Sequence, residues 1–233
     1  MPQTTLAIVE QQDDAPAGNL ATWARDRGLG VEILHAQELG TSWPDPARYG
    51  AIAALGAEHS VHASPDAWIG AEVAFLRAAH DAGVPVLGLC FGGQALAAAL
   101  GAEVRLAPEP EIGWFDVEAL DGGAIPPGPW FEWHVDTFAV PAGARQLART
   151  PGCPQAFAVG TSVGLQFHPE ADEAIILDWI RTGRDSLEAN GVDPDALRER
   201  TRAAAPAARE HAYALFDAIA TTWTRTPRPN VQS

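Results

Sequence analysis

The sequence contains no lysine. Its 15 basic residues are all arginine and stand against 30 acidic residues, so the 233-residue chain carries a formal net charge of −15. Proteins that bind a nucleic-acid backbone or an anionic membrane need clustered positive charge, which this sequence does not offer. We therefore expect no nucleic-acid partner and no membrane partner.

Cysteine is also scarce, because the chain has only Cys90 and Cys153. Two cysteines do not make the disulfide framework of a small secreted domain. No stretch approaches the roughly 18 apolar residues of a membrane span, and the first residues lack the charged start and apolar run of a secretion signal. These absences predict a cytoplasmic protein whose thiols stay reduced.

Motifs for cofactors and metals are missing as well. No dinucleotide-binding fingerprint and no phosphate-binding loop of the G-x-x-x-x-G-K type occurs. His59 and His62 form the one close histidine pair, and no third ligand lies at a helpful spacing. The sequence predicts neither a cofactor nor a metal.

The first hundred residues do contain a regular alternation of apolar strands and amphipathic helices. This order predicts an α/β fold, doubly wound, with a mostly parallel sheet and helices on both faces. The expected strands cover residues 6–10, 31–36, 51–55 and 84–89, and the expected helices cover the segment between Pro16 and Gly28, then 68–83 and 94–101.

Beyond residue 104 the pattern changes to shorter strands separated by proline- and glycine-rich turns, followed by a helix near 171–183. An Ala- and Arg-rich segment at 195–223 predicts one or two further helices. We expect an α/β domain at 1–183, a C-terminal helical extension at 184–223, and a disordered tail at 224–233.

Cys90 ends the buried strand in the stretch VPVLGLCFGGQ. A lone cysteine in an apolar run is often a small core residue. Here, however, Gly88 and Gly92 flank the cysteine where a strand turns directly into a helix, which is typical of a nucleophile elbow. The start of the helix favours the thiolate, and the amide of Phe91 would point at a developing oxyanion.

His168 is the histidine best placed to serve such a nucleophile, because a strand ends at VGLQFHPE. Glu170 lies two residues further, on the same side of an extended chain, and Pro169 fixes the backbone between them. Glu170 can accept from one ring nitrogen while the other faces the sulfur. A salt-bridged surface pair is the alternative interpretation.

Together these segments resemble the class I glutamine amidotransferases of the Cys-His-Glu type. The resemblance covers roughly residues 5 to 180 and is strongest to free-standing members that are similar to the amidotransferase domain of GMP synthetase. The segments that carry it are PVLGLCFGGQALAAALGAEV (85–104), EIGW (111–114), WHVDTFAVPAGARQLART (133–150), QAFAVG (155–160) and GLQFHPE (164–170).

The resemblance implies a flavodoxin-like α/β domain that hydrolyses the side-chain amide of L-glutamine through a γ-glutamyl thioester. It implies Cys90 as the nucleophile, His168 as general base and then acid, and Glu170 as the residue that orients His168. Phe91 would donate one oxyanion hydrogen bond, and Gln94 would contact the bound glutamine. Because the chain has no room for a fused synthetase, the ammonia would pass to a partner synthetase in trans or to solvent.

One loop departs from the family pattern. The second oxyanion donor of the family lies in a Gly-Gly-Pro loop, which here reads Gly56, Ala57, Glu58. Ala57 keeps its N–H, so the donor survives if the φ angle is negative; a positive φ would cost on the order of 1 kcal/mol or more. Glu58 is expected to alter how the α-amino group of a substrate is held.

His134 and Asp136 match a recurrent element of the free-standing members, and we expect them at the rim of the site as substrate-binding residues. The alternative is a strand face that pairs with its neighbour. His59 and His62, which flank the altered loop, are expected to be solvated.

Three other functions stay open on the sequence. An α/β-hydrolase of the dienelactone-hydrolase kind shares the elbow but lacks the His-Pro-Glu segment. A hydrolase of γ-glutamyl peptides or conjugates would use the same triad with a different substrate. A non-catalytic regulatory or ligand-binding module of the same fold would normally have lost part of the triad, which is complete here.

Overall fold

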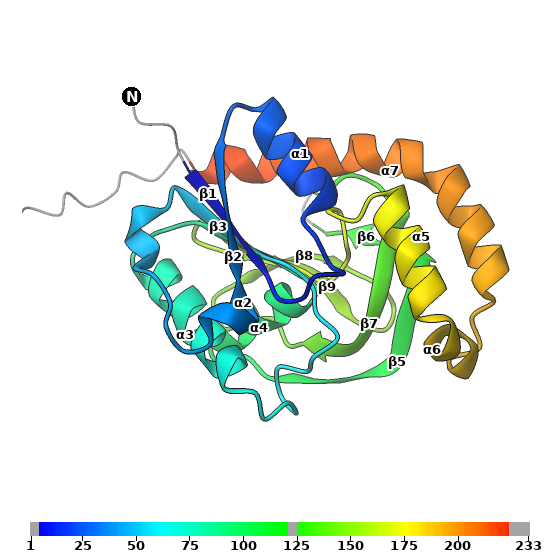
Figure 1. Ribbon diagram of the computed structural model, residues 1–233, viewed down its shortest axis with the longest axis horizontal. Helices are drawn as coiled ribbons and strands as arrows, with labels where there is room; N and C mark the ends of the chain where they lie inside the picture. Colours follow the sequence, from blue (N-terminus) through cyan, green and yellow to red (C-terminus); the bar gives the residue numbers. More distant parts are fainter. Residues whose placement is uncertain (1–4, 121–124, 224–233) are drawn as a thin grey trace, which may run out of the picture.

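The computed structural model describes residues 5–120 and 125–223 (Figure 1). The tail at 224–233, predicted to be disordered, lies outside the described residues. An eight-stranded sheet forms the centre, with strand order β2-β1-β3-β4-β10-β9-β8-β6. In that order the strands are Gly30–His35, Thr5–Glu10, Ala51–Ala54, Val86–Leu89, Ser162–Leu165, Pro154–Val159, Arg145–Arg149 and Glu118–Ala119.

The half of the sheet that contains β1 to β4 and β10 is parallel, as the alternating sequence pattern predicts. Helix α1 (Gly18–Asp26) and the end of α7 (Pro194–Trp223) bury their apolar residues on one face. Helices α3 (Ala67–Asp81) and α4 (Phe91–Ala99) cover the other face. The doubly wound α/β fold with helices on both faces is therefore confirmed. Two short helices, α2 (Ala36–Leu39) and the 3₁₀ helix η1 (Pro46–Arg48), lie between β2 and β3.

The second half of the chain adds antiparallel strands. β9 pairs antiparallel with β10 and with β8, and β8 pairs with β6. Strands β5 (Val104–Phe115) and β7 (Trp130–Phe138) form a separate two-stranded sheet. Most of these segments are strands, as their sequences predict. β8 was not predicted, because its RQLAR sequence lacks a clear alternation, and the separation of β5 and β7 from the main sheet was not predicted either.

The C-terminal segment begins with α5 (Glu173–Thr182) and α6 (Arg184–Ala189), which pack with β5 and β7 in a smaller apolar cluster. The Ala- and Arg-rich segment is one continuous helix, α7. Leu215 and Phe216 near its end lie in the same core cluster as Leu6 of β1. The division at residue 183 stays a prediction. Among residues 5–120 and 125–223, no helix has both the length and the apolar character of a membrane span.

The loops that follow β1, β3, β4 and β10 leave the sheet at the same edge, since these strands are parallel. This edge is where open α/β sheets bind ligands. It collects residues 11–17, 55–66, 90–91 and 166–172 from four distant parts of the sequence.

Candidate active site

Cys90 lies at the turn from β4 into α4 with φ +50°, and among the described residues it is the one non-glycine with a positive φ. Such a strained conformation at a strand-to-helix turn is the geometry of a nucleophile elbow. The turn is tight: a Cβ on Gly88 would lie 2.3 Å from the Gly92 carbonyl oxygen, and one on Gly92 would lie 2.1 Å from that of Ala54. The glycines that flank Cys90 are thus required by close backbone approach, as the sequence predicted.

The Cys90 side chain is 5% exposed and its sulfur has two weak contacts. The Sγ atom lies 3.9 Å from the backbone oxygen of Trp133, and the side-chain amide of Gln166 donates to it over 3.8 Å. The Cys90 N–H donates to the Leu165 carbonyl at 3.0 Å, which ties the elbow to β10. The sulfur therefore donates one weak hydrogen bond, to Trp133, and accepts another, from Gln166.

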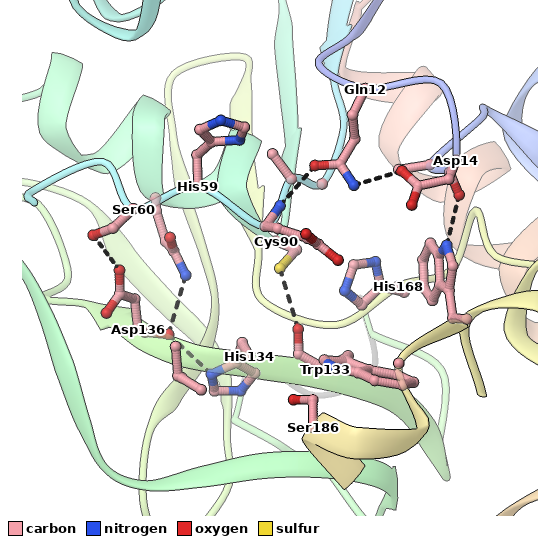
Figure 2. A pocket seen from close by; sticks show the side chains of 18 of the residues that line it. Gln12, Asp14, His59, Ser60, Cys90, Trp133, His134, Asp136, His168 and Ser186 are labelled. Atoms are coloured by element: carbon pink, nitrogen blue, oxygen red, sulfur yellow. Dashed lines mark hydrogen bonds between the residues drawn. The ribbon is translucent and has the colours of Figure 1, made fainter. Parts of the chain in front are cut away.

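His168 is buried beside Cys90, and Figure 2 shows its ring next to the Cys90 side chain. Its Nδ1 atom lies 2.8 Å from a carboxylate oxygen of Glu170, while Nε2 has no hydrogen-bond partner within the described part of the chain. Burial alone lowers the pKa of His168, but the nearby Cys90 and Glu170 outweigh burial and raise that pKa well above its ordinary value. This arrangement favours the protonated form of His168.

The first turn of α1 supports the His-Pro-Glu segment, a contact that the sequence analysis missed. The Asn19 N–H donates to the Glu170 carbonyl at 2.8 Å, and the Asn19 side chain donates to the Pro169 carbonyl. Gly18 has φ +38°, and a Cβ there would lie 2.3 Å from the same Glu170 oxygen. The partners lie about 150 positions apart in sequence, so no local pattern reveals them.

The altered loop after β3 lies directly against Cys90 and His168. A Cβ on Gly56 would come within 3.0 Å of His168 Cε1, so only glycine fits there without movement. Ala57 does not adopt a positive φ, so its replacement of glycine carries no backbone strain. Across residues 5–120 and 125–223, the N–H groups of Ala57 and Phe91 have no hydrogen-bond acceptor. Their role as oxyanion donors stays a prediction.

Glu58 lines the same cavity, and its backbone N–H donates to Gln12 Oε1 at 2.8 Å. Gln12 in turn donates to Asp14, which continues the wall toward α5. The cavity measures about 600 Å³. Cys90 and His168 lie at its base, and the remaining walls come from loop 56–63, strand β7 and the junction of α5 with α6.

Gln94 and Asp136 line the cavity but are already engaged. The Gln94 side-chain amide donates to the Asp136 carbonyl at 3.0 Å and faces Gln166 at 3.4 Å. The Asp136 carboxylate accepts from Ser60 Oγ at 2.6 Å and lies 3.2 Å from His62 Nε2. Asp136 therefore lines the cavity and also anchors the altered loop to β7; its role in substrate binding stays a prediction. His62, predicted to be solvated, is exposed and also contacts this carboxylate.

His134 is likewise buried, with only its edge on the cavity. Its Nδ1 atom lies 2.9 Å from the Asp136 carbonyl and its Nε2 atom 3.1 Å from a carboxylate oxygen of Glu111. His134 therefore lines the cavity, while its side-chain contacts are those of a strand face that pairs with its neighbour. Its role as a substrate-binding residue stays a prediction.

Two kinds of comparison with known proteins agree with this geometry. Residues 60–174 match the family described as glutamine amidotransferase class-I. A GMP synthase (glutamine-hydrolyzing) of Aeropyrum pernix is 37% identical over 159 residues, covering 65% of this chain and 30% of the relative. One of Ralstonia pickettii is 32% identical over 152 residues, covering 58% and 28%. The chain thus spans less than a third of the length of these curated relatives.

Solved structures show the same fold over nearly the whole chain. A glutamine amidotransferase from Thermotoga maritima superposes with a TM-score of 0.84 at 24% identity, covering 94% of this chain and 99% of the other. A glutamine amido transferase from Methylobacillus flagellatus gives 0.86 at 21% identity, covering 99% and 100%. The matched segment contains Cys90, His168 and Glu170, and over this segment the chain is similar to the class I glutamine amidotransferases.

Proposed function

We propose that this protein hydrolyses the side-chain amide of L-glutamine through a thioester on Cys90. The observation that carries the proposal is the triad geometry. Cys90 sits on a strained elbow beside an unpartnered Nε2 of His168, whose other nitrogen is fixed by Glu170 at 2.8 Å. This is the nucleophile, base and orienting acid of acyl transfer.

In the first half of the reaction the Cys90 thiolate attacks the γ-carbonyl carbon, and the new S–C bond places negative charge on the carbonyl oxygen. The amides of Ala57 and Phe91 stabilise that oxyanion. The imidazolium of His168 then gives its Nε2 proton to the departing nitrogen, the C–N bond breaks, and ammonia leaves.

In the second half, His168 is neutral and accepts a proton from water, which attacks the thioester. The S–C bond breaks, glutamate leaves, and the proton held by His168 restores the imidazolium and thiolate pair. Glutamine and water are consumed, and glutamate and ammonia are formed. No step needs a cofactor.

The fate of the ammonia is also part of the proposal. The relatives of Aeropyrum pernix and Ralstonia pickettii are GMP synthases described as glutamine-hydrolyzing. We infer from this similarity that an ammonia-accepting synthetase uses the ammonia released at Cys90.

The first experiment measures glutamate release from L-glutamine by the wild-type chain and by Cys90→Ala. We expect release by the wild type and none above background by the variant, which lacks the sulfur and keeps the Cβ atom. Glutamate release that survives in Cys90→Ala would rule out the thioester. If the wild type is inert but Cys90 is labelled selectively by a glutamine-like affinity reagent, the triad is competent and turnover needs the partner. If neither occurs, the fold is a non-catalytic module.

A second candidate substrate is a γ-glutamyl peptide or conjugate, and the cavity is the observation that favours it. His168 protonates the leaving nitrogen, so the leaving group lies on the His168 side. There the cavity continues past Trp133 and Trp179 to Thr182 and Ser186. Ammonia needs no such space. Parallel assays with γ-glutamyl-p-nitroanilide and glutathione distinguish the substrates, because a conjugate hydrolase would cleave one of these at a higher kcat/KM than glutamine.

A further inference from the structure

A second buried polar cluster lies beside the triad and takes part in no step of the proposed reaction. It contains Glu111 of β5 and Glu132 and His134 of β7, and one ligand atom from each lies within 4.8 Å of the others. Glu111 pairs directly with His134 across the β5–β7 ladder. Glu132 precedes His134 by two residues and therefore points to the same face of β7.

The orientation of the His134 ring is fixed by its backbone contact. Nδ1 lies 2.9 Å from the Asp136 carbonyl oxygen, which can only accept, so Nδ1 carries the proton. Nε2 points between two carboxylates, 3.1 Å from Glu111 and 3.5 Å from Glu132. An imidazole whose far nitrogen donates to a carbonyl is the arrangement found at metal sites.

Glu111 is held in the same way by neighbouring side chains. Thr150 Oγ1 donates to one carboxylate oxygen at 2.6 Å, and Gln155 Nε2 donates to the other at 2.6 Å. These two hydrogen bonds hold the Glu111 carboxylate in one orientation, as a metal ligand requires.

Glu132 is the residue that the protein itself leaves unsatisfied. Its side chain is 0% exposed, and neither carboxylate oxygen has a hydrogen-bond partner within the described residues. An ionised Glu132 would be an unpaired buried charge, and a protonated Glu132 would have an O–H with no acceptor. Either state costs free energy in an interior that satisfies the other two members of the cluster.

We propose that Glu111, Glu132 and His134 bind one divalent transition-metal cation, with Zn²⁺ as the ion that fits best. In a tetrahedral Zn²⁺ site with bonds of about 2.0 Å, neighbouring ligand atoms lie about 3.3 Å apart. The two distances from His134 Nε2, 3.1 and 3.5 Å, bracket that value. A neutral imidazole and two carboxylates also balance a 2+ charge, and they form a ligand set suited to Zn²⁺.

The position of the cluster gives the cation a structural role. Strand β7 supplies the Phe131 carbonyl that accepts from the His168 N–H at 2.9 Å, and the Trp133 carbonyl that contacts the Cys90 sulfur. A cation that joins Glu111 of β5 to Glu132 and His134 of β7 would fix these carbonyls. The cation touches no substrate.

The test measures metal content and needs no turnover, so it is independent of the proposed glutamine hydrolysis. The full-length Cys90→Ser chain, which cannot bind metal through the catalytic thiolate, is loaded with Zn²⁺ and freed of excess by gel filtration. We expect about one Zn²⁺ per chain. Replacement with Co²⁺ should give visible absorption without a thiolate charge-transfer band.

Glu132→Gln in the same background removes one ligand without changing the size of the side chain, and we expect Zn²⁺ affinity to fall at least 100-fold. Glu72→Gln is the matched control. Glu72 is also a fully buried carboxyl, with a pKa raised to about 8 by burial, but it lies on α3 and pairs with Gln11. That variant should bind Zn²⁺ like its parent.

Three results would overturn the proposal. They are a Cys90→Ser chain that retains no Zn²⁺ after loading, equal Zn²⁺ affinity in Glu132→Gln and Glu72→Gln, and a Co²⁺ spectrum with thiolate character. The first result rests on the chain with all three ligands intact, so a folding defect in Glu132→Gln cannot mask it. Any of them would leave the cluster as a hydrated hydrogen-bond network.

Discussion

Two buried histidines of this protein each meet carboxylates, yet their surroundings suit different chemistry. In His168, Nδ1 is hydrogen-bonded to Glu170, and Nε2 has no partner among the described residues and lies beside the Cys90 sulfur. In His134, Nδ1 is hydrogen-bonded to a backbone carbonyl, and Nε2 faces Glu111 and Glu132. A free nitrogen beside a thiol can move a proton, whereas a nitrogen between two carboxylates can only be paired or ligated. The residue that fixes the first nitrogen decides what the second nitrogen can do.

The largest expected effect is a loss of kcat, which should be much greater for a substitution of His168 than for one of His134. His168→Asn should lower kcat for glutamine hydrolysis by about 10²- to 10⁴-fold, the range for loss of a general acid and base. His134→Asn should instead lower the unfolding midpoint and leave a larger share of kcat, because His134 touches no reacting atom. Steady-state glutamate release and thermal unfolding of both variants check this. Equal losses of kcat in the two variants, with unchanged unfolding midpoints, would contradict the assignment of a catalytic role to His168 and a structural role to His134.

A smaller loss of kcat is expected when the backbone N–H of Ala57, a proposed oxyanion donor, is removed. No such donor is proposed near His134. Ala57→Pro removes the N–H of the altered loop and should lower kcat by about 10²- to 10³-fold. Ala57→Gly keeps the N–H and serves as the matched control, with less than a tenfold change expected. If both variants hydrolyse glutamine at similar rates, Ala57 is not an oxyanion donor.

The smallest expected effect concerns the carboxylate that orients His168. Glu170→Gln keeps an oxygen that can accept from Nδ1 but removes the charge. Hydrogen bonds to charged groups contribute about 1.5–3 kcal/mol, so kcat should fall roughly 10- to 100-fold.

The pH profile of Glu170→Gln tests the direction in which Glu170 shifts the pKa of His168. Glu170 is one of the groups that raise the pKa of His168, so removing its charge lowers that pKa. Activity requires the imidazolium proton, and the alkaline limb of the kcat profile should therefore move to lower pH in Glu170→Gln. An alkaline limb that stays in place, or moves upward, would show that Glu170 does not stabilise the His168 proton.

The Cys90 elbow and the pairing of His168 with Glu170 were predictable from the sequence, because each depends on residues that are close together in the chain. The elbow needs glycines within two residues of Cys90, and the pairing of His168 with Glu170 needs only an extended chain with a two-residue repeat. The parallel sheet followed from the alternation of strands and helices, and the common edge of its strands placed loop 55–66 near the elbow. Strand β8 was missed because RQLAR alternates poorly.

The sequence by itself predicted the fold class and pointed to Cys90, His168 and Glu170 as the proposed nucleophile, base and orienting acid, because each motif depends on neighbours along the chain. The tertiary structure alone decided that Asp136 anchors the altered loop through Ser60 and His62 and that Asn19 holds the His-Pro-Glu segment. It also decided that Glu111 meets Glu132 and His134, because β5 and β7 must pair before these groups approach. Contacts between segments that far apart in the chain depend on strand register and packing, which no local pattern encodes.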